Sequence, residues 1–166
     1  MPFKAGDCVV HPTYGVSSVV RLEERQLAEV TPRLYYVLSA EKSTIWVPVA
    51  TSDHIGLRYL TPKRDLEKHR ALLSGRPTAL SKDHRDRRLT IVERLKQGSF
   101  EGICEVVRDL SALAWRKPLS DADAALYHQA HDNLCHEWAA SGHMSIEAAV
   151  TEVDGLLARA RQTYMA

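Results

Sequence analysis

The chain has 166 residues, which is enough for one domain or two small ones. Hydrophobic residues make up 45% of it and charged residues 26%, a balance that excludes both a disordered chain and an integral membrane protein. The formal net charge is +1, so the chain as a whole is not the uniformly basic kind that binds nucleic acids.

Residues 1–60 have the pattern of β-structure. Short runs of β-branched and aromatic residues are separated by turn signals such as Gly6-Asp7 and Tyr14-Gly15. Pro12 and Pro48 lack the main-chain N–H that a central strand needs, so each marks a turn, an edge strand or a bulge. The expected strands are 8–10, 16–22, 34–38 and 45–49. Such short, closely spaced strands predict a small barrel.

From Thr61 onward the apolar period becomes helical and predicts five helices with short connections. In the second of them, which runs to Gly98, the inner side is expected to carry Ile91, Val92 and Leu95. Each helix follows a residue that can cap it, namely Thr61, Ser81, Ser99, Ser120 and Ser145. The predicted fold class is therefore α+β, with a β-barrel over residues 1–60 and a compact helical domain over residues 61–166.

The small net charge conceals a strong polarity along the chain. Residues 1–60 are neutral, residues 61–98 carry a net +6, and residues 99–166 carry a net −5. Lys and Arg side chains that neutralise phosphates supply most of the non-specific affinity of a protein for DNA. The middle segment is therefore where a polyanion would bind.

The three cysteines, Cys8, Cys104 and Cys135, are odd in number and scattered, unlike the disulfide frameworks of small secreted domains. They are expected to be reduced thiols. No apolar run approaches the ~20 residues that cross a bilayer, and no signal-peptide pattern precedes the first strand. We therefore expect a cytoplasmic protein that has no membrane partner.

Several segments resemble one known family, the CarD/CdnL family of RNA polymerase-binding transcription regulators. They are Phe3–Gly15, Trp46-Val47-Pro48, His54–Arg58 and Glu105–Leu110, which together span nearly the whole chain. The resemblance implies that the N-terminal domain is a Tudor-like, SH3-like barrel that binds the β subunit of bacterial RNA polymerase. It further implies that the helical domain contacts promoter DNA near the upstream edge of the melted bubble and modulates open-complex stability.

The resemblance places polymerase binding at an edge of the barrel, where one strand adds to an exposed strand of the β subunit. Arg25 occupies a position where the family often has a contact arginine. Trp46 occupies a second contact position, although relatives often have a basic residue there. The alternative is that Trp46 has a structural role, as a half-buried aromatic residue of the barrel. The candidate polymerase-binding residues are Arg25, Ile45, Trp46, Val47 and Pro48.

The resemblance also places DNA binding at the start of the second predicted helix, where the candidates are Lys82, His84, Arg85, Arg87 and Arg88. Helix N-termini and clustered cations both bind phosphates. His84 aligns with a tryptophan that wedges into the minor groove in the family. Because imidazole is smaller and more polar than indole, we expect a weaker wedge. The alternative is a basic face that is merely solvated.

A second cluster suggests another function. His128, His131 and Cys135 share one face of a predicted helix, and Cys104 or His143 could complete a zinc site. A metal or redox sensor is therefore an alternative function, although packed or exposed histidines explain the pattern equally well. No phosphate-binding glycine loop, nucleophile elbow or HExxH pair is present, so we expect no enzyme activity and no cofactor. A further alternative is a polymerase-binding paralogue that competes with a relative or recruits another partner.

Overall fold

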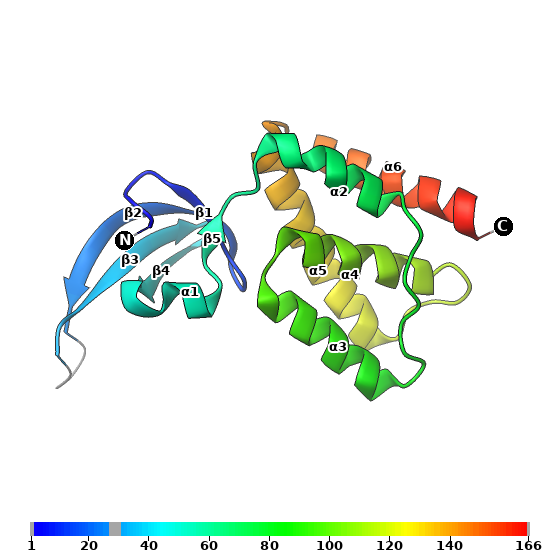
Figure 1. The fold of residues 1–166 in the computed structure, drawn as a ribbon, viewed down its shortest axis with the longest axis horizontal. Helices are drawn as coiled ribbons and strands as arrows, with labels where there is room; N and C mark the ends of the chain where they lie inside the picture. The colour runs from blue at the N-terminus through cyan, green and yellow to red at the C-terminus, as the bar shows by residue number, and fades with distance from the viewer. Residues whose placement is uncertain (1, 27–30, 166) are drawn as a thin grey trace. The chain divides into compact units, whose positions relative to one another are not determined.

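The computed structural model of the chain describes residues 2–26 and 31–165. The chain divides into two units, Met1–Leu60 and Thr61–Ala166, which are described separately below. The first unit contains an antiparallel sheet and the second is helical, so the fold class is α+β, as predicted (Figure 1).

The first unit holds a five-stranded antiparallel sheet in the order β4-β3-β2-β1-β5. Its strands are β1 Cys8–His11, β2 Gly15–Arg25, β3 Arg33–Ala40, β4 Ser43–Pro48 and β5 Arg58–Tyr59. The first four lie where β-branched and aromatic runs predict them. The two-residue β5 carries no strand signal, because only its pairing with β1 defines it. No pairing joins β4 to β5 in the described residues, so the ladder leaves both as end strands.

The core of the first unit lies on one face of this sheet. It is built from Phe3, Val9, Val19, Tyr36, Leu38, Val47 and Leu57. Side chains alternate between the two faces along a strand, so Val47 and its cross-strand neighbour Tyr36 face this core. Trp46, which is paired with Val37, faces the other way. The register of β4 against β3 therefore determines which β4 side chains lie outside the core.

Beyond β4 the structure departs from the predicted strand 45–49. The strand ends at Pro48, and Val49 begins a 3₁₀ turn, η1 Val49–Thr51, followed by the one-turn helix α1 Ser52–Ile55. Gly56 ends α1 in the left-handed conformation with φ of 94°, which glycine adopts at little cost. The described residues therefore contain six helices and not the five predicted, because α1 belongs to the first unit.

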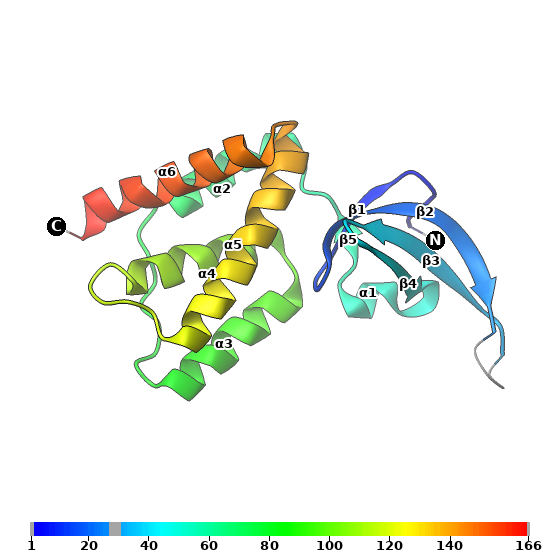
Figure 2. The ribbon, with the colours of Figure 1, turned by 180° about the vertical axis from the view of Figure 1, so that it is seen from behind.

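The second unit contains the other five helices. They are α2 Leu66–Leu73, preceded by the 3₁₀ turn η2 Lys63–Asp65, then α3 His84–Gln97, α4 Phe100–Leu113, α5 Asp121–Gly142 and α6 Ile146–Tyr164. Helix α4 packs against each of the other four and contributes Ile103, Val106, Val107 and Leu110 to the core (Figures 1 and 2). Its apolar residues recur every three or four positions, which is why it can occupy the centre.

Three of the five predicted helix caps are confirmed. Ser99, Ser120 and Ser145 each accept a hydrogen bond from the N–H three residues on, at 3.0, 3.2 and 3.1 Å. The other two predictions are wrong. Asp83 caps α3 in place of Ser81, accepting from the N–H of Asp86 at 3.1 Å.

Thr61 does not cap α2, because buried Glu137 of α5 engages it. Its hydroxyl and its main-chain N–H both donate to Glu137 Oε2, at 2.6 and 3.2 Å. The carbonyl of Thr61 in turn accepts from the hydroxyl of Ser141 at 2.7 Å. Three polar groups of Thr61, the first residue of the second unit, are therefore hydrogen-bonded to α5.

Candidate polymerase-binding and DNA-binding surfaces

Strand β4 is an end strand of the sheet and pairs, among the described strands, only with β3. An end strand presents alternate main-chain N–H and C=O groups that another chain can pair with. Pro48 removes one donor at its last position, which limits the length over which a partner strand can add. The sheet edge that the family resemblance requires is thus present at the predicted strand.

Arg25 and Trp46 lie together beside this edge. The guanidinium carbon of Arg25 lies 4.7 Å from the centre of the Trp46 ring, within the range of a cation–π contact. The indole N–H of Trp46 donates to Glu23 Oε2 at 3.2 Å, and Arg21 pairs with the same oxygen at 3.3 Å. The two predicted contact residues therefore form one preorganised cluster rather than two separate contacts.

Glu23 is a member of this cluster that the sequence analysis did not identify. The hydrogen bond from Trp46, together with Arg21 and Arg25, lowers the pKa of the Glu23 carboxyl below its usual value and outweighs the opposing effect of desolvation. An ionised Glu23 orients the indole between its own carboxylate and Arg25. The signal that could have found it is the alternation of Arg21, Glu23 and Arg25 on one face of β2.

Two of the predicted polymerase-binding side chains face the core instead. Val47 is only 2% exposed, and Ile45 packs partly against the same core. The Val47 side chain is therefore closed to a partner, and that of Ile45 is accessible only in part. Trp46 is 39% exposed and lies on the outer face, where Pro48 is half-buried. The accessible side-chain surface is therefore that of Arg25 and Trp46.

In the second unit, four of the five predicted DNA-binding residues are exposed: Lys82, His84, Arg85 and Arg88. Arg87 is the exception, with 5% exposure, and the prediction that it contacts DNA is wrong. The charge run therefore contains one cation with a structural role. The other four remain predicted contacts.

Arg87 joins the N-termini of α3 and α5. Its guanidinium donates to Asp123 Oδ2 from Nε and Nη2 at 3.2 and 2.7 Å, and to the carbonyl of Ser81 from Nη1 at 2.8 Å. A further contact of 2.8 Å joins Nη2 to His84 Nδ1. Because arginine has only donors, His84 accepts at Nδ1 and carries its proton on Nε2.

The buried carboxylate of Asp123 is matched to this arginine. Burial by itself would raise the pKa of Asp123, but hydrogen bonds from Arg87 and Ser120 and the charge of Arg87 outweigh it and lower the pKa. Asp123 is therefore ionised and its charge is compensated within the protein. The pair holds α3 and α5 together rather than offering a charge to a ligand.

The exposed side of α3 mixes cations with apolar side chains. Leu89 is 63% exposed and Val92 is 39% exposed, so the prediction that Val92 faces inward is wrong, whereas Ile91 is buried as predicted. At 100° per residue these two share a face with three exposed cations. We call this face the α3 stripe; it consists of Arg85, Arg88, Leu89, Val92 and Lys96. Leu89 is its most exposed apolar member and was missed from the sequence.

The histidine face of α5 does not form a metal site. Among the described residues, no group of three or more His, Cys, Asp and Glu side chains is arranged to hold a metal ion. His128 is exposed, and His131 Nε2 lies 2.7 Å from Asp154 Oδ1 of α6. Cys135 Sγ lies 3.9 Å from His131 Nδ1. One helix face thus contributes a His–Asp contact between α5 and α6.

The thiols in this region are poorly suited to redox sensing. Burial, with nearby Asp154 and Asp132, raises the pKa of Cys135 to about 12, so the thiolate that reacts with oxidants is scarce. Cys104 is fully buried, and burial raises its pKa well above the ordinary value. Neither of these cysteines forms a disulfide, and Cys8 forms none either. The geometry therefore does not favour the sensor alternative.

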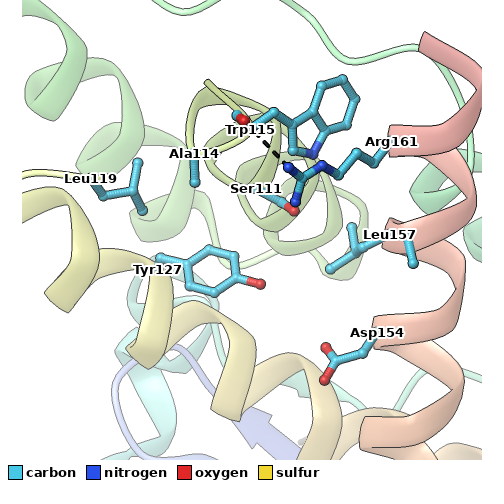
Figure 3. A pocket seen from close by; sticks show the side chains of 9 residues that line it. Ser111, Ala114, Trp115, Leu119, Tyr127, Asp154, Leu157 and Arg161 are labelled. Atoms are coloured by element: carbon cyan, nitrogen blue, oxygen red, sulfur yellow. Dashed lines mark hydrogen bonds between the residues drawn. The ribbon is translucent and has the colours of Figure 1, made fainter. Parts of the chain in front are cut away.

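Asp154 also borders a pocket of about 380 Å³ between α4, α5 and α6. In Figure 3, the Tyr127 hydroxyl points into this pocket, and Arg161 and Asp154 lie on α6 at opposite ends of it. Arg161 donates to the carbonyl of Trp115 at 3.4 Å. Burial, with nearby Asp154, raises the pKa of Tyr127 to about 12, so its hydroxyl stays protonated.

An open sheet edge in the first unit and a basic and apolar stripe on α3 in the second are features typical of a class of binding proteins. Family comparison identifies the class. Residues 3–60 match the model of the CarD-like/TRCF RID domain, and residues 69–154 match that of the CarD C-terminal domain. The chain belongs to the CarD family, and the predicted resemblance is confirmed. It is a transcription regulator of the CarD type.

A curated relative supports the same class. The Bacillus subtilis (strain 168) protein named "Putative transcription factor YdeB" is 22% identical over 136 residues, covering 81% of this chain and 89% of the relative. In the described part of the chain, no helix is both long and apolar enough to cross a membrane.

Proposed function

We propose that the first unit is a Tudor-like module that binds the RNA polymerase β subunit, and that the second unit contacts promoter DNA at the upstream edge of the bubble. The observation that carries the proposal is the Arg25–Trp46 cluster beside an unpaired strand edge. Main-chain pairing along β4 would supply affinity. Arg and Trp, the residue types most common at binding hot spots, would supply specificity.

The α3 stripe supports the DNA part of the proposal. Proteins that open or bend DNA from the minor groove combine cations, which hold the phosphates, with apolar side chains that insert between base steps. Arg85, Arg88 and Lys96 would hold phosphates, and Leu89 would supply the apolar contact that His84 cannot. The stripe thus offers both kinds of contact on one helix face.

The two contacts reinforce one another through covalent linkage. Once the first unit is bound to polymerase, the second meets promoter DNA at a high effective concentration, so a weak DNA contact suffices. The resulting shift between closed and open complexes cannot exceed the difference in affinity for those two states. Modulation of open-complex stability therefore requires the α3 stripe to distinguish melted from duplex promoter.

The whole proposal is tested by retention of the full chain on the isolated β-subunit lobe, followed by promoter binding with and without polymerase. We expect retention on the β lobe, and DNA binding that is weak alone and strong when polymerase is present. Failure of the β lobe to retain the folded chain would contradict the polymerase contact. Equal DNA binding with and without polymerase would contradict the linkage.

Two substitutions in the α3 stripe separate the effect of a cation on DNA binding from that of an apolar side chain. Arg88→Ala should weaken promoter binding on all sequences and reduce the slope of log affinity against log salt by about 1. Leu89→Ser should leave that slope unchanged and reduce open-complex lifetime, because it removes an apolar contact and no charge. Fluorescence anisotropy at several salt concentrations and a transcription assay measure the two effects. Lys68→Ala, an exposed cation of α2, is the matched control.

One observation favours a second candidate function. Buried Arg87 engages Nδ1 of His84, the residue that the family resemblance aligns with the wedge tryptophan. A regulator with this arrangement would bind polymerase without stabilising the open complex, and would compete with a relative that carries the tryptophan. Competition on the β lobe, with no change in open-complex lifetime, would support this second function over the first.

A further inference from the structure

A cavity of about 660 Å³ lies in the second unit, on the inner side of the start of α3. Its walls come from the segment before α3, the C-terminal part of α4 and the connection from α4 to α5. Cavities that bind small organic ligands commonly measure about 300–1,000 Å³. The lining includes Leu80, Lys82, His84, Leu113, Arg116 and Leu119.

The three cations in the lining of this cavity donate hydrogen bonds and do not accept them. Lys82, Arg116 and Lys117 are exposed at its rim and form no ion pair with the described residues. His84 adds a further donor, because its Nδ1 accepts from Arg87 and its proton is on Nε2.

One carboxylate, that of Asp123, also lines the cavity, and its Oδ1 has no hydrogen-bond partner among the described residues. Asp123 is 1% exposed, and its charge is compensated by Arg87, which is itself 5% exposed. Neither member of this buried pair adds a net charge. The electrostatic character of the cavity is therefore set by the three rim cations, which favour an anion that is rich in acceptor oxygens.

The rest of the wall is apolar. Leu80, Leu113 and Leu119 are partly buried side chains, and Ala112 and Pro118 complete the surface between them. An inorganic anion would leave this apolar wall uncovered. A ligand that fills the cavity must therefore carry an apolar or aromatic body as well as an anionic group.

We propose that this cavity binds an organic phosphate, an ester whose phosphate lies at the Lys82, Arg116 and Lys117 rim and whose planar body packs against the leucine wall. A phosphate dianion suits a rim that carries three cations better than a single carboxylate does. A nucleoside monophosphate combines the two required parts in a size that suits the cavity. Adenosine 5′-monophosphate is therefore the probe.

Binding is tested by titrating three probes into the ¹⁵N-labelled full chain and following amide shifts. Adenosine 5′-monophosphate should bind saturably and shift amides around Lys82, Ala112 and Lys117. Adenosine and inorganic phosphate, each lacking one half of the ligand, should bind at least tenfold more weakly. Equal affinity for inorganic phosphate would overturn the proposal, as would amide shifts outside the cavity.

Two variants test the rim and the wall separately. Arg116→Glu should weaken binding of adenosine 5′-monophosphate at least tenfold, and Ala112→Leu should weaken it by filling the cavity without a change of charge. Lys68→Glu, an equal charge change at an exposed site on α2, should have no effect. Thermal unfolding of each variant verifies the fold. Unchanged affinity in folded Arg116→Glu would overturn the proposal.

Occupancy of the cavity would also regulate DNA binding, a consequence that rests on the proposed function. Lys82 and His84 belong both to the cavity lining and to the predicted DNA contact, so a bound phosphate should lower promoter affinity. Adenosine 5′-monophosphate should therefore weaken promoter binding of the wild-type chain and not of Arg116→Glu. A chain that binds the nucleotide but no promoter would contradict the proposed function and leave the cavity site standing.

Discussion

Replacing Arg87 with methionine should lower the free energy of unfolding of the second unit by about 3–5 kcal/mol, the usual effect of removing one member of a buried ion pair. The reason is that Asp123, which is 1% exposed, would lose the arginine that compensates its buried charge. The substitution also removes two hydrogen bonds that join α3 to Asp123 of α5 and two that hold the start of α3 itself, at Ser81 and His84. Urea denaturation of the full chain, followed by far-ultraviolet circular dichroism, measures the loss.

Arg88 provides the matched control for this prediction. It is the next residue in the same helix and is exposed, so Arg88→Met should change stability by no more than about 0.5 kcal/mol. Adding Asp123→Leu to Arg87→Met should recover part of the loss, because no unpaired charge then remains buried. Equal stabilities of Arg87→Met and Arg88→Met would contradict the structural role of Arg87.

The same pair gives a pH dependence with a definite sign. The pKa of Asp123 lies below its ordinary value of 3.8, so the folded chain holds this proton more weakly than the unfolded chain. The stabilisation is therefore complete above pH 3.8 and is lost as the pH falls through the lowered pKa. A pH series of urea denaturation should show this acid-side loss in the wild-type chain and a smaller one in Arg87→Met.

Replacing Arg25 with glutamate should abolish retention of the chain on the polymerase β subunit while leaving the fold intact. The substitution removes the cation that lies over Trp46 and places a second carboxylate beside Glu23. Hot-spot residues of this type contribute at least about 2 kcal/mol, or roughly a 30-fold change in affinity. Biolayer interferometry with the immobilised β lobe measures the affinity, and circular dichroism verifies the fold.

Two further variants define what Arg25 contributes. Lys4→Glu makes the same charge change at an exposed position of the first unit and should leave β-lobe affinity within about twofold. Trp46→Ala should reduce the affinity as Arg25→Glu does, because the two side chains form one cluster. Unchanged retention of folded Arg25→Glu would refute the contact, and an intact affinity in Trp46→Ala would refute the cluster.

Local signals account for the parts of the fold that were predicted. The serine caps of α4, α5 and α6 are set by residues three positions apart, and β1 to β4 are set by runs of β-branched and aromatic residues. Strand β5 and the anchoring of Thr61 depend on partners far along the chain. Such partners leave no local pattern, so these features could not be derived from the sequence.

The candidate site residues also divide into those that local spacing predicts and those that distant partners determine. The α3 charge run was visible, but its cations could not be told apart, because the partner that buries Arg87 lies 36 residues away in the chain. The helical spacing of Arg87 and Ile91 was the available hint that both face inward. Leu89 and Val92 lie on the opposite face of α3 from Arg87 and Ile91, and both are exposed. On β4, strict alternation places Trp46 outside and Val47 inside, and that distinction was available from the sequence.

The fastening of Thr61 has a mechanical consequence for the whole chain. Strand β5 ends at Tyr59, and Thr61 is already held by Glu137 and Ser141, so Leu60 alone separates two anchored segments. One residue spans at most about 3.6 Å, which leaves almost no slack in the connection. Inserting a flexible stretch after Leu60 should therefore weaken transcriptional output with both binding surfaces intact, because a longer connection lowers the effective concentration of the second unit at promoter DNA once the first unit is bound.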